Sequence, residues 1–185
     1  MSEEAILENQ TRQAADDRLA LMHLPAYARF IRENCLVPYI REQLNTARAH
    51  NLPMLKFFKS MPDEEIIAMG IETHKEYLRS LEENSLKELL EKSLEKWVAE
   101  RLGILKREEI SAEDINLAGF IRKKALLKVL PSYTCDINEA IEIIEEIDTG
   151  TFLTNTPGSN LYINHLKARM NEEVGPDQET SGEFR

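Results

Sequence analysis

Cys135 and His74 are the two side chains of this sequence that could take part directly in chemistry. Cys135 stands between Tyr133 and Asp136 in a short stretch, and a cysteine becomes a strong nucleophile when a histidine lies beside it. No histidine is close to it in the sequence, so the fold would have to bring one near. The pattern therefore favours a loop residue over a nucleophile. The histidines that could serve are His23, His50, His74 and His165.

His74 falls on an apolar stripe at helical spacing, between Ile71 and Leu78. If the chain binds haem or another small ligand, His74 is the residue that we expect at the site. A lone histidine on a packed face is more often a core side chain satisfied by a carbonyl, and we favour that interpretation. The surrounding THKEYLRS lacks the acid and the proline of a histidine-kinase phosphoacceptor box, so phosphoryl transfer to His74 is not expected.

The sequence contains no pattern typical of a metal or cofactor site. Cys35 and Cys135 lie a hundred positions apart with no CxxC pair, which indicates neither a disulfide framework nor a zinc site. A carboxylate di-metal bundle needs Glu-x-x-His on two helices, and that motif is absent from the sequence. There is no phosphate loop or dinucleotide fingerprint either. We therefore predict no catalytic residue, no metal and no cofactor, and a protein that is not itself an enzyme.

Composition indicates a helical, acidic protein. Aromatic residues make up only 6% of the 185 residues and charged residues 30%, a balance that favours an all-α fold. The net charge of -10 disfavours nucleic acid and anionic membrane surfaces as partners. No apolar run approaches the roughly 20 residues of a spanning helix, and the acidic first residues lack the apolar core of a secretory signal. These features predict a cytoplasmic protein without membrane insertion.

Helical signals recur along the chain. Residues 3–22 form a weakly amphipathic, peripheral candidate, and residues 25–50 form a long helical segment. Pro38 interrupts that segment, so we expect a kink or a change of helix near residues 34–37. An apolar turn at Met54, Leu55, Phe57 and Phe58 could plug the end of a bundle. A further helix is predicted to open at Ser60–Asp63 and to carry the stripe from Ile67 to Leu81. Others are predicted over 86–103 after the capping box at Ser85, with Trp97 in the core, and after the cap Ser111.

The segment from Pro131 to Asp136 joins two helices. A basic helix ends at Pro131, and Asp136 and Glu139 form a capping box at the start of an acidic one. Because the connection is short, we expect the two helices to be antiparallel neighbours. We also expect Lys124 or Lys128 to lie near Glu139 or Glu142.

After residue 148 the sequence TGTFLTNTPGSN is rich in Gly, Pro, Thr and Asn and predicts a loop. A last helix follows over about 161–174, with a narrow seam near coiled-coil spacing. We expect this helix to form part of a homodimer contact; the alternative is that it folds back onto its own bundle. Residues 175–185 read as a disordered tail. The seam residues are Ile163, Leu166, Met170 and Val174.

The segment EEISAEDINLAGFIRKKALLKVLPSYTCDINEAIEIIEEID, with the Leu86–Gly103 stretch before it, resembles N-terminal helical regulatory domains of bacterial two-component sensor histidine kinases. It is similar to the haem-free, globin-related N-terminal domains of stressosome regulators. The resemblance covers roughly residues 25–150. It implies a globin-like α-fold, dimerisation, signal input and no catalysis. The Leu86–Gly103 stretch, where haem globins would carry their proximal histidine, has none.

These observations predict a single globin-like helical bundle of five to seven helices. Residues 1–22 would be a peripheral helix, 23–150 the sensory or regulatory domain, 151–174 a loop and output helix, and 175–185 the tail. The expected function is signal input to a downstream module. The alternatives are a globin-like sensor of haem, another tetrapyrrole or a small ligand, and a small helical enzyme using Cys135 or His74. The sequence identifies neither the signal nor the downstream partner.

Overall fold

The computed structural model describes residues 21–86, 88, 89, 92, 101–102, 105–106 and 111–173. Among them are five α-helices: α2 (Leu24–Phe30), α3 (Leu36–Ala49), α4 (Asp63–Glu82), α6 (Ala112–Val129) and α7 (Ile137–Glu173). The π-helical turn η1 (Ile31–Cys35) and the 3-10 turns η2 (Pro53–Phe58) and η4 (Leu130–Ser132) complete the helical part. The prediction of an all-α chain is confirmed. Residues 1–20, Trp97 and the tail lie outside the described residues.

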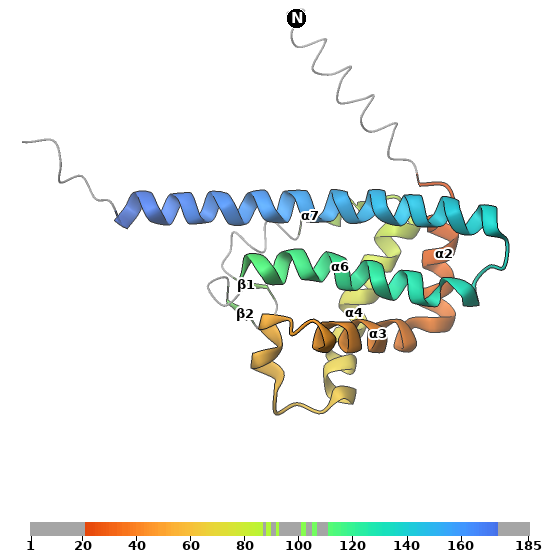
Figure 1. Cartoon of the computed structure of the whole chain (residues 1–185), viewed down its shortest axis with the longest axis horizontal. Helices are drawn as coiled ribbons and strands as arrows, with labels where there is room; N and C mark the ends of the chain where they lie inside the picture. Colours follow the sequence, from red (N-terminus) through yellow and green to blue (C-terminus); the bar gives the residue numbers. More distant parts are fainter. Residues whose placement is uncertain are drawn as a thin grey trace, which may run out of the picture.

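The core lies where α2, α3, α4, α6 and α7 meet. Figure 1 shows α7 lying along α6, with α3 on the other side of α6 and α2 and α4 crossing them. Side chains from all five helices are almost fully buried there, and burial of each contributes on the order of 2 kcal/mol. The Tyr27 hydroxyl also donates to the Leu126 carbonyl at 2.5 Å, which ties α2 to α6. The most deeply buried apolar residues include Leu24, Tyr27, Ile31, Tyr39, Leu78, Leu81, Leu126, Ile143 and Ile147.

The chain changes direction between α2 and α3, as the position of Pro38 predicts (Figure 1). Pro38 has no N–H to give to the carbonyl of Asn34, so regular α-helix cannot continue through this point. The structure accommodates the break with the π-helical turn η1. The Asn34 side chain turns back and donates to the Phe30 carbonyl at 3.1 Å, which satisfies one of the main-chain groups at the turn.

The helices on either side of Pro131 pack together in opposite directions, which confirms the expectation from their short connection (Figure 1). Both predicted caps are present as well. The Ser111 hydroxyl accepts from Asp114 N at 3.1 Å, and the Asp136 carboxylate accepts from Asn138 N at 2.8 Å. Side-chain oxygens thereby satisfy main-chain donors that the helices leave free at their first turns.

The predicted ion pairs between these two helices were wrong. In the described part of the chain, the pair that joins α6 to α7 is Lys123 with Asp148. Glu142 instead lies against His23, at 2.8 Å, and the Lys124 ammonium sits 5.5 Å from the centroid of the Phe120 ring. A basic residue of α6 does pair with an acidic residue of α7, as expected. The rotation of each helix about its axis decides which residues meet.

The predicted loop over TGTFLTNTPGSN was also wrong, because α7 runs without a break from Ile137 to Glu173. Each threonine of the stretch turns its hydroxyl back onto a carbonyl of the preceding turn. Contacts with α6 then continue along this part of α7: a Cβ at Gly119 would overlap the Asn155 amide, and Ser159 Oγ lies 3.3 Å from Asn116 Oδ1. Tertiary packing therefore overrides weak helix propensity here. The threonines are Thr149, Thr151, Thr154 and Thr156.

The helix predicted over residues 86–103 does not include residues 101–102. Residues 101–102 belong to strand β1 (Arg101–Leu102), which pairs antiparallel with β2 (Leu105–Lys106). Arg101 faces Lys106 in this short ladder and Leu102 faces Leu105. Gly103, interpreted from the sequence as a helix stop, lies outside the described residues.

Two carboxylates fasten distant parts of the chain to the bundle. Glu146 of α7 accepts from the main-chain N–H groups of Met22, His23 and Leu24 at 2.7 to 3.1 Å; we call this the N-terminal clasp. Asp114 of α6 accepts from Met54 N at 2.7 Å and from the main chain and hydroxyl of Ser111; we call this the Asp114 clasp. One clasp holds the start of α2 and the other holds η2.

Candidate functional site

His74 lies half-buried in the middle of α4, one turn after Gly70. Its Nδ1 is 2.6 Å from the Gly70 carbonyl oxygen. A carbonyl can only accept, so Nδ1 carries the proton and Nε2 keeps its lone pair. Burial lowers the pKa of His74, which favours this neutral form. The ring fits because residue 70 is glycine: a Cβ there would lie 3.1 Å from two ring atoms.

Four polar side chains surround His74 where α3, α4 and α6 meet, and together they form the polar cluster. The rings of Tyr39 and His74 meet edge to face with their centroids 5.9 Å apart. The guanidinium of Arg122 lies over the ring of Tyr77, 4.2 Å from its centroid. Gln43 stands one helical turn after Tyr39 on α3. The members of the polar cluster are Tyr39, Gln43, His74, Tyr77 and Arg122.

Two buried atoms of the polar cluster, Tyr39 OH and Gln43 Nε2, make no hydrogen bond of normal geometry in the described part of the chain. The side chain of Gln43 nevertheless lies close enough to the Tyr39 hydroxyl to act as its hydrogen-bonding neighbour. Burial raises the pKa of both Tyr39 and Tyr77, so both phenols stay protonated. Unsatisfied buried groups cost roughly 1–3 kcal/mol each, which makes them unusual in a core. The polar cluster thus offers two donors, a ring nitrogen and a cation within one interior region.

The second sequence candidate, Cys135, does not meet a histidine in the described residues. Its side chain is exposed in the connection between η4 and α7. Tyr133 packs against the rings of Tyr27 and Phe30, with centroids 5.2 and 5.3 Å away, and Asp136 caps α7.

The histidines of the described side chains are engaged elsewhere. The His23 ring meets Glu142, the His74 ring meets Gly70 and Tyr39, and the His50 ring lies 4.9 Å from that of Phe120. Within the described ranges no group of three or more His, Cys, Asp or Glu side chains could hold a metal ion. The chemistry that this part of the molecule assembles is hydrogen bonding around His74.

Sequence reasoning found His74 but missed its four neighbours. Arg122 belongs to a basic run that reads as solvent-facing, and only the fold turns it toward Tyr77. A usable signal was present on α3, where Tyr39 and Gln43 stand four residues apart on the same helix face. A glutamine beside a tyrosine on a buried face indicates a polar interior.

Comparison with protein-family models, with curated proteins and with solved structures finds no match to this chain. No helix within the described residues is long and apolar enough to cross a membrane. Inference about function therefore starts from the polar cluster and from the helices that surround it.

Proposed function

We propose that this protein is a cytoplasmic regulatory module that receives an input at the polar cluster and passes it on through α7. In the form suggested by its sequence resemblance, it is a globin-like signal-input domain of a bacterial sensor histidine kinase system. It does not itself catalyse a reaction, and kinase activity would belong to a separate module. Its partners would be a second copy of itself and that downstream module.

The observation that carries the proposal is the length of α7 together with the burial of only one of its ends. This helix has 37 residues and is roughly 55 Å long. Ile143 and Ile147, in its first third, are almost fully buried in the core. Its far end continues past the start of α6 (Figure 1). A helix that is fixed in the core at one end and extends past the described bundle at the other is suited to carrying a small shift outward.

The polar cluster and α7 share an intermediate in α6. Arg122 reaches into the polar cluster over Tyr77, and the next residue, Lys123, pairs with Asp148 of α7. A displacement of α6 would therefore change both the contact of Arg122 with Tyr77 and the ion pair of Lys123 with Asp148. Packed helices switch between discrete arrangements, so such a displacement would couple the two places.

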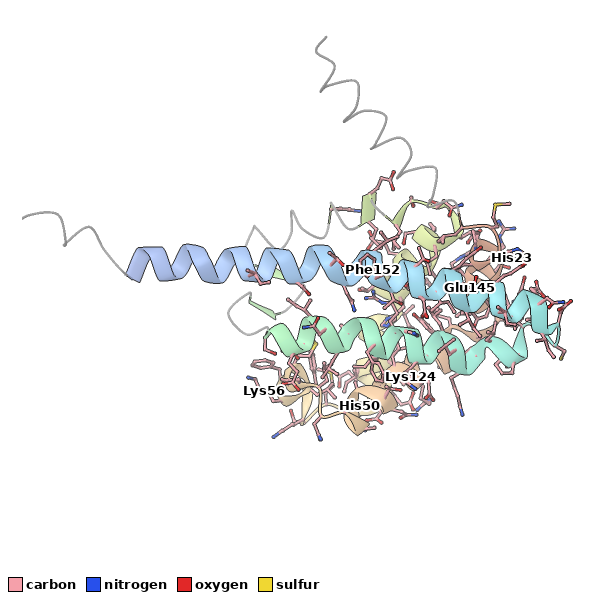
Figure 2. All side chains as sticks on the ribbon, turned by 45° about the horizontal axis from the view of Figure 1, so that its top comes forward. His23, His50, Lys56, Lys124, Glu145 and Phe152 are labelled. Carbon is pink, nitrogen blue, oxygen red and sulfur yellow. The ribbon has the colours of Figure 1, made fainter. Side chains whose placement is uncertain are left out.

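The outer side of α7 supports a homodimer. Apolar side chains remain exposed there, including Phe152, which Figure 2 shows on the outside of the helix. Ile137, Ile141 and Ile144 fall within roughly 60° of arc on an ideal helix, away from the buried Ile143 and Ile147, and form an apolar stripe. Ile163 lies further along, in the i, i+4 row of Asn155 and Ser159 that contacts α6. A second copy can bury this stripe, whereas the described bundle leaves it open. The exposed apolar residues are Ile137, Ile141, Ile144, Phe152 and Ile163.

Light scattering on the intact chain tests the dimer. We expect a dimer, and we expect the double substitution Phe152→Asp and Ile163→Asp to give a folded monomer. The matched control is Val37→Asp with Met69→Asp, two residues of similar character that are 43% and 47% exposed away from α7. If the natural chain is a monomer, the proposed homodimer is wrong. If the control variant dissociates as much as the Phe152 and Ile163 variant does, α7 is not the dimer contact.

Amide hydrogen exchange tests the transmission. Substitution His74→Leu changes the polar cluster without touching α7, and we expect exchange rates within residues 149–160 to change at least threefold. Met69→Ala, an exposed change on the same helix as His74, should leave them as they are. If α7 is indifferent to both substitutions, the polar cluster is not an input site.

A globin-like sensor of haem or another small ligand is the second candidate. It is favoured by the orientation of His74, because a histidine that donates through Nδ1 to a carbonyl presents Nε2 as a ligand. We expect the protein to stay colourless when haem is offered. A sharp Soret band that His74→Ala abolishes would establish the alternative instead.

A further inference from the structure

A groove of about 430 Å³ opens between the end of α3, η2 and the first turn of α4. Its walls are partly apolar and partly basic, and its volume falls in the range of about 300–1,000 Å³ that is typical of small-molecule sites. It shares no residue with the polar cluster. Figure 1 places η2 on the side of the bundle away from α7. The apolar side chains that line it are Leu52, Leu55, Phe58 and Ile66.

The charge of the groove is opposite to that of the protein. Arg48, Lys56 and Lys59 line it, and none of its lining residues is acidic, although the chain carries a net charge of -10. Arg48 is held by Asp63, through an Nη1 to Oδ2 contact of 2.8 Å. Neither lysine pairs with an acid in the described ranges, and Lys56 Nζ lies 4.8 Å from the centroid of the Phe57 ring. Two lysines that line the groove are thus free of an acidic partner in the part of the chain that the structure describes.

Hydrogen bonds fix the backbone on two sides of the groove. Asn51 adopts a left-handed conformation with φ of 51°, which lets Leu52 N donate to the Ala47 carbonyl at 2.9 Å and close α3. The Asp114 clasp then fixes Met54 at the start of η2. A site that is already formed costs little ordering when a ligand binds.

We propose that this groove binds a small amphipathic organic anion. Its carboxylate or phosphate head would lie between Lys56 and Lys59, and its apolar body would cover Leu55, Phe58 and Ile66. Phosphate and carboxylate heads offer the same recognition chemistry to two ammonium groups. The volume suits a molecule with one ring or a short chain. The proposal does not depend on the regulatory function of α7.

Titration of the intact chain with phenylbutyrate, followed by NMR amide shifts, tests this proposal. We expect saturable shifts confined to residues 48–66. Phenylbutanol, which lacks the charge, and phenylbutylamine, which reverses it, should bind at least tenfold more weakly. Benzyl phosphate, compared with phenylbutyrate, shows which anionic head the two lysines prefer. Equal binding of acid, alcohol and amine, or shifts spread over the whole protein, would overturn the proposal.

Variants separate a local site from general attraction. Lys56→Gln with Lys59→Gln should weaken phenylbutyrate binding about tenfold, because two partly exposed charge contacts are lost. Lys124→Gln with Lys128→Gln removes the same charge from α6, outside the groove, and should leave binding within twofold; Figure 2 shows Lys56 and Lys124 well apart. Equal weakening in both variants would overturn the site. Loss of a dimer in the first variant would instead assign the groove to a second copy.

Discussion

The two clasps use the same chemistry in different surroundings. In each, a helix carboxylate accepts main-chain N–H groups from a segment far away in the sequence: 60 positions separate Met54 from Asp114, and 124 separate Met22 from Glu146. Asp114 is 1% exposed, whereas Glu146 is only half-buried and Met22 is 76% exposed. The Asp114 clasp is part of the interior, and the N-terminal clasp lies at the surface.

This difference decides what each carboxylate contributes. Water can take the place of Glu146 at an exposed donor such as Met22 N, because the donor is already in contact with solvent. The Asp114 side chain is almost fully buried, so removing it would leave its donors in a part-buried site that solvent fills less readily than the surface around Met22. An interior hydrogen bond is therefore costly to remove even when it adds little to net stability while it is present.

The largest effect is expected for Asp114→Ala. It leaves the N–H groups of Met54 and Ser111 without their acceptor, and we expect a loss of about 3 kcal/mol in the free energy of unfolding, measured with urea. The matched control is Asp136→Ala, which removes an exposed helix cap and should cost about 1 kcal/mol. Equal losses for the two variants would mean that burial does not distinguish them.

A smaller loss is expected for Glu146→Ala. Glu146 acts as a long-range cap for the first turn of α2, and removal of a helix cap typically costs about 0.5–2 kcal/mol. Hydrogen exchange should accelerate at His23 and Leu24 and stay unchanged at Met54. If Glu146→Ala lowers the free energy of unfolding more than Asp114→Ala does, the surface clasp contributes more than the interior one, against our expectation.

Sequence patterns predicted the parts of this fold that act over a few residues. Ser111 and Asp136 cap helices by reaching two or three positions along the chain, and Pro38 interrupts a helix through a carbonyl four positions back. The antiparallel pairing of α6 and α7 followed from a short connection. Each of these predictions depends on local geometry alone.

The predictions that failed depend on contacts between distant segments. The stretch around Gly150 and Pro157 reads as a loop, and it is helical where Asn155 packs on Gly119 and Ser159 meets Asn116. Ser111 and Asp114 have the spacing of a capping box, but the long-range partners of the two clasps, Met54 and residues 22–24, have no sequence signature, because an acid on a helix looks the same until its distant partner is placed. The neighbours of His74 were missed for this reason too.

The contrast between interior and surface extends to the histidines, beginning with His74. Burial lowers its pKa in the folded state, so below about pH 6.5 the unfolded chain binds a proton that the folded chain resists. The free energy of unfolding is therefore highest above that pH, where His74 is neutral in both states, and it decreases as the pH falls. In urea titrations, His74→Leu should be unchanged or up to about 1 kcal/mol more stable at pH 8, with a larger advantage at pH 5.

His74→Gln separates the two effects of that substitution. Glutamine does not titrate, so it should also remove the loss of stability at low pH. It keeps a polar side chain inside the bundle, however, and should not gain stability at pH 8. If His74→Leu and the natural chain lose stability in parallel between pH 8 and pH 5, the buried ring is not the titrating group.

The smallest effect is expected where a histidine lies at the surface. His23 Nε2 is 2.8 Å from Glu142 Oε2, a contact as short as those of either clasp, but the two side chains are 39% and 53% exposed. Solvent screens such a pair and replaces either partner, so Glu142→Gln at pH 7 should change the free energy of unfolding by less than about 0.5 kcal/mol. Glu146, one turn further along α7, provides the matched comparison, because it holds the same segment through main-chain donors. If Glu142→Gln costs as much as Glu146→Ala, then the side chain of His23, rather than the main chain of residues 22–24, fastens the start of α2 to the bundle.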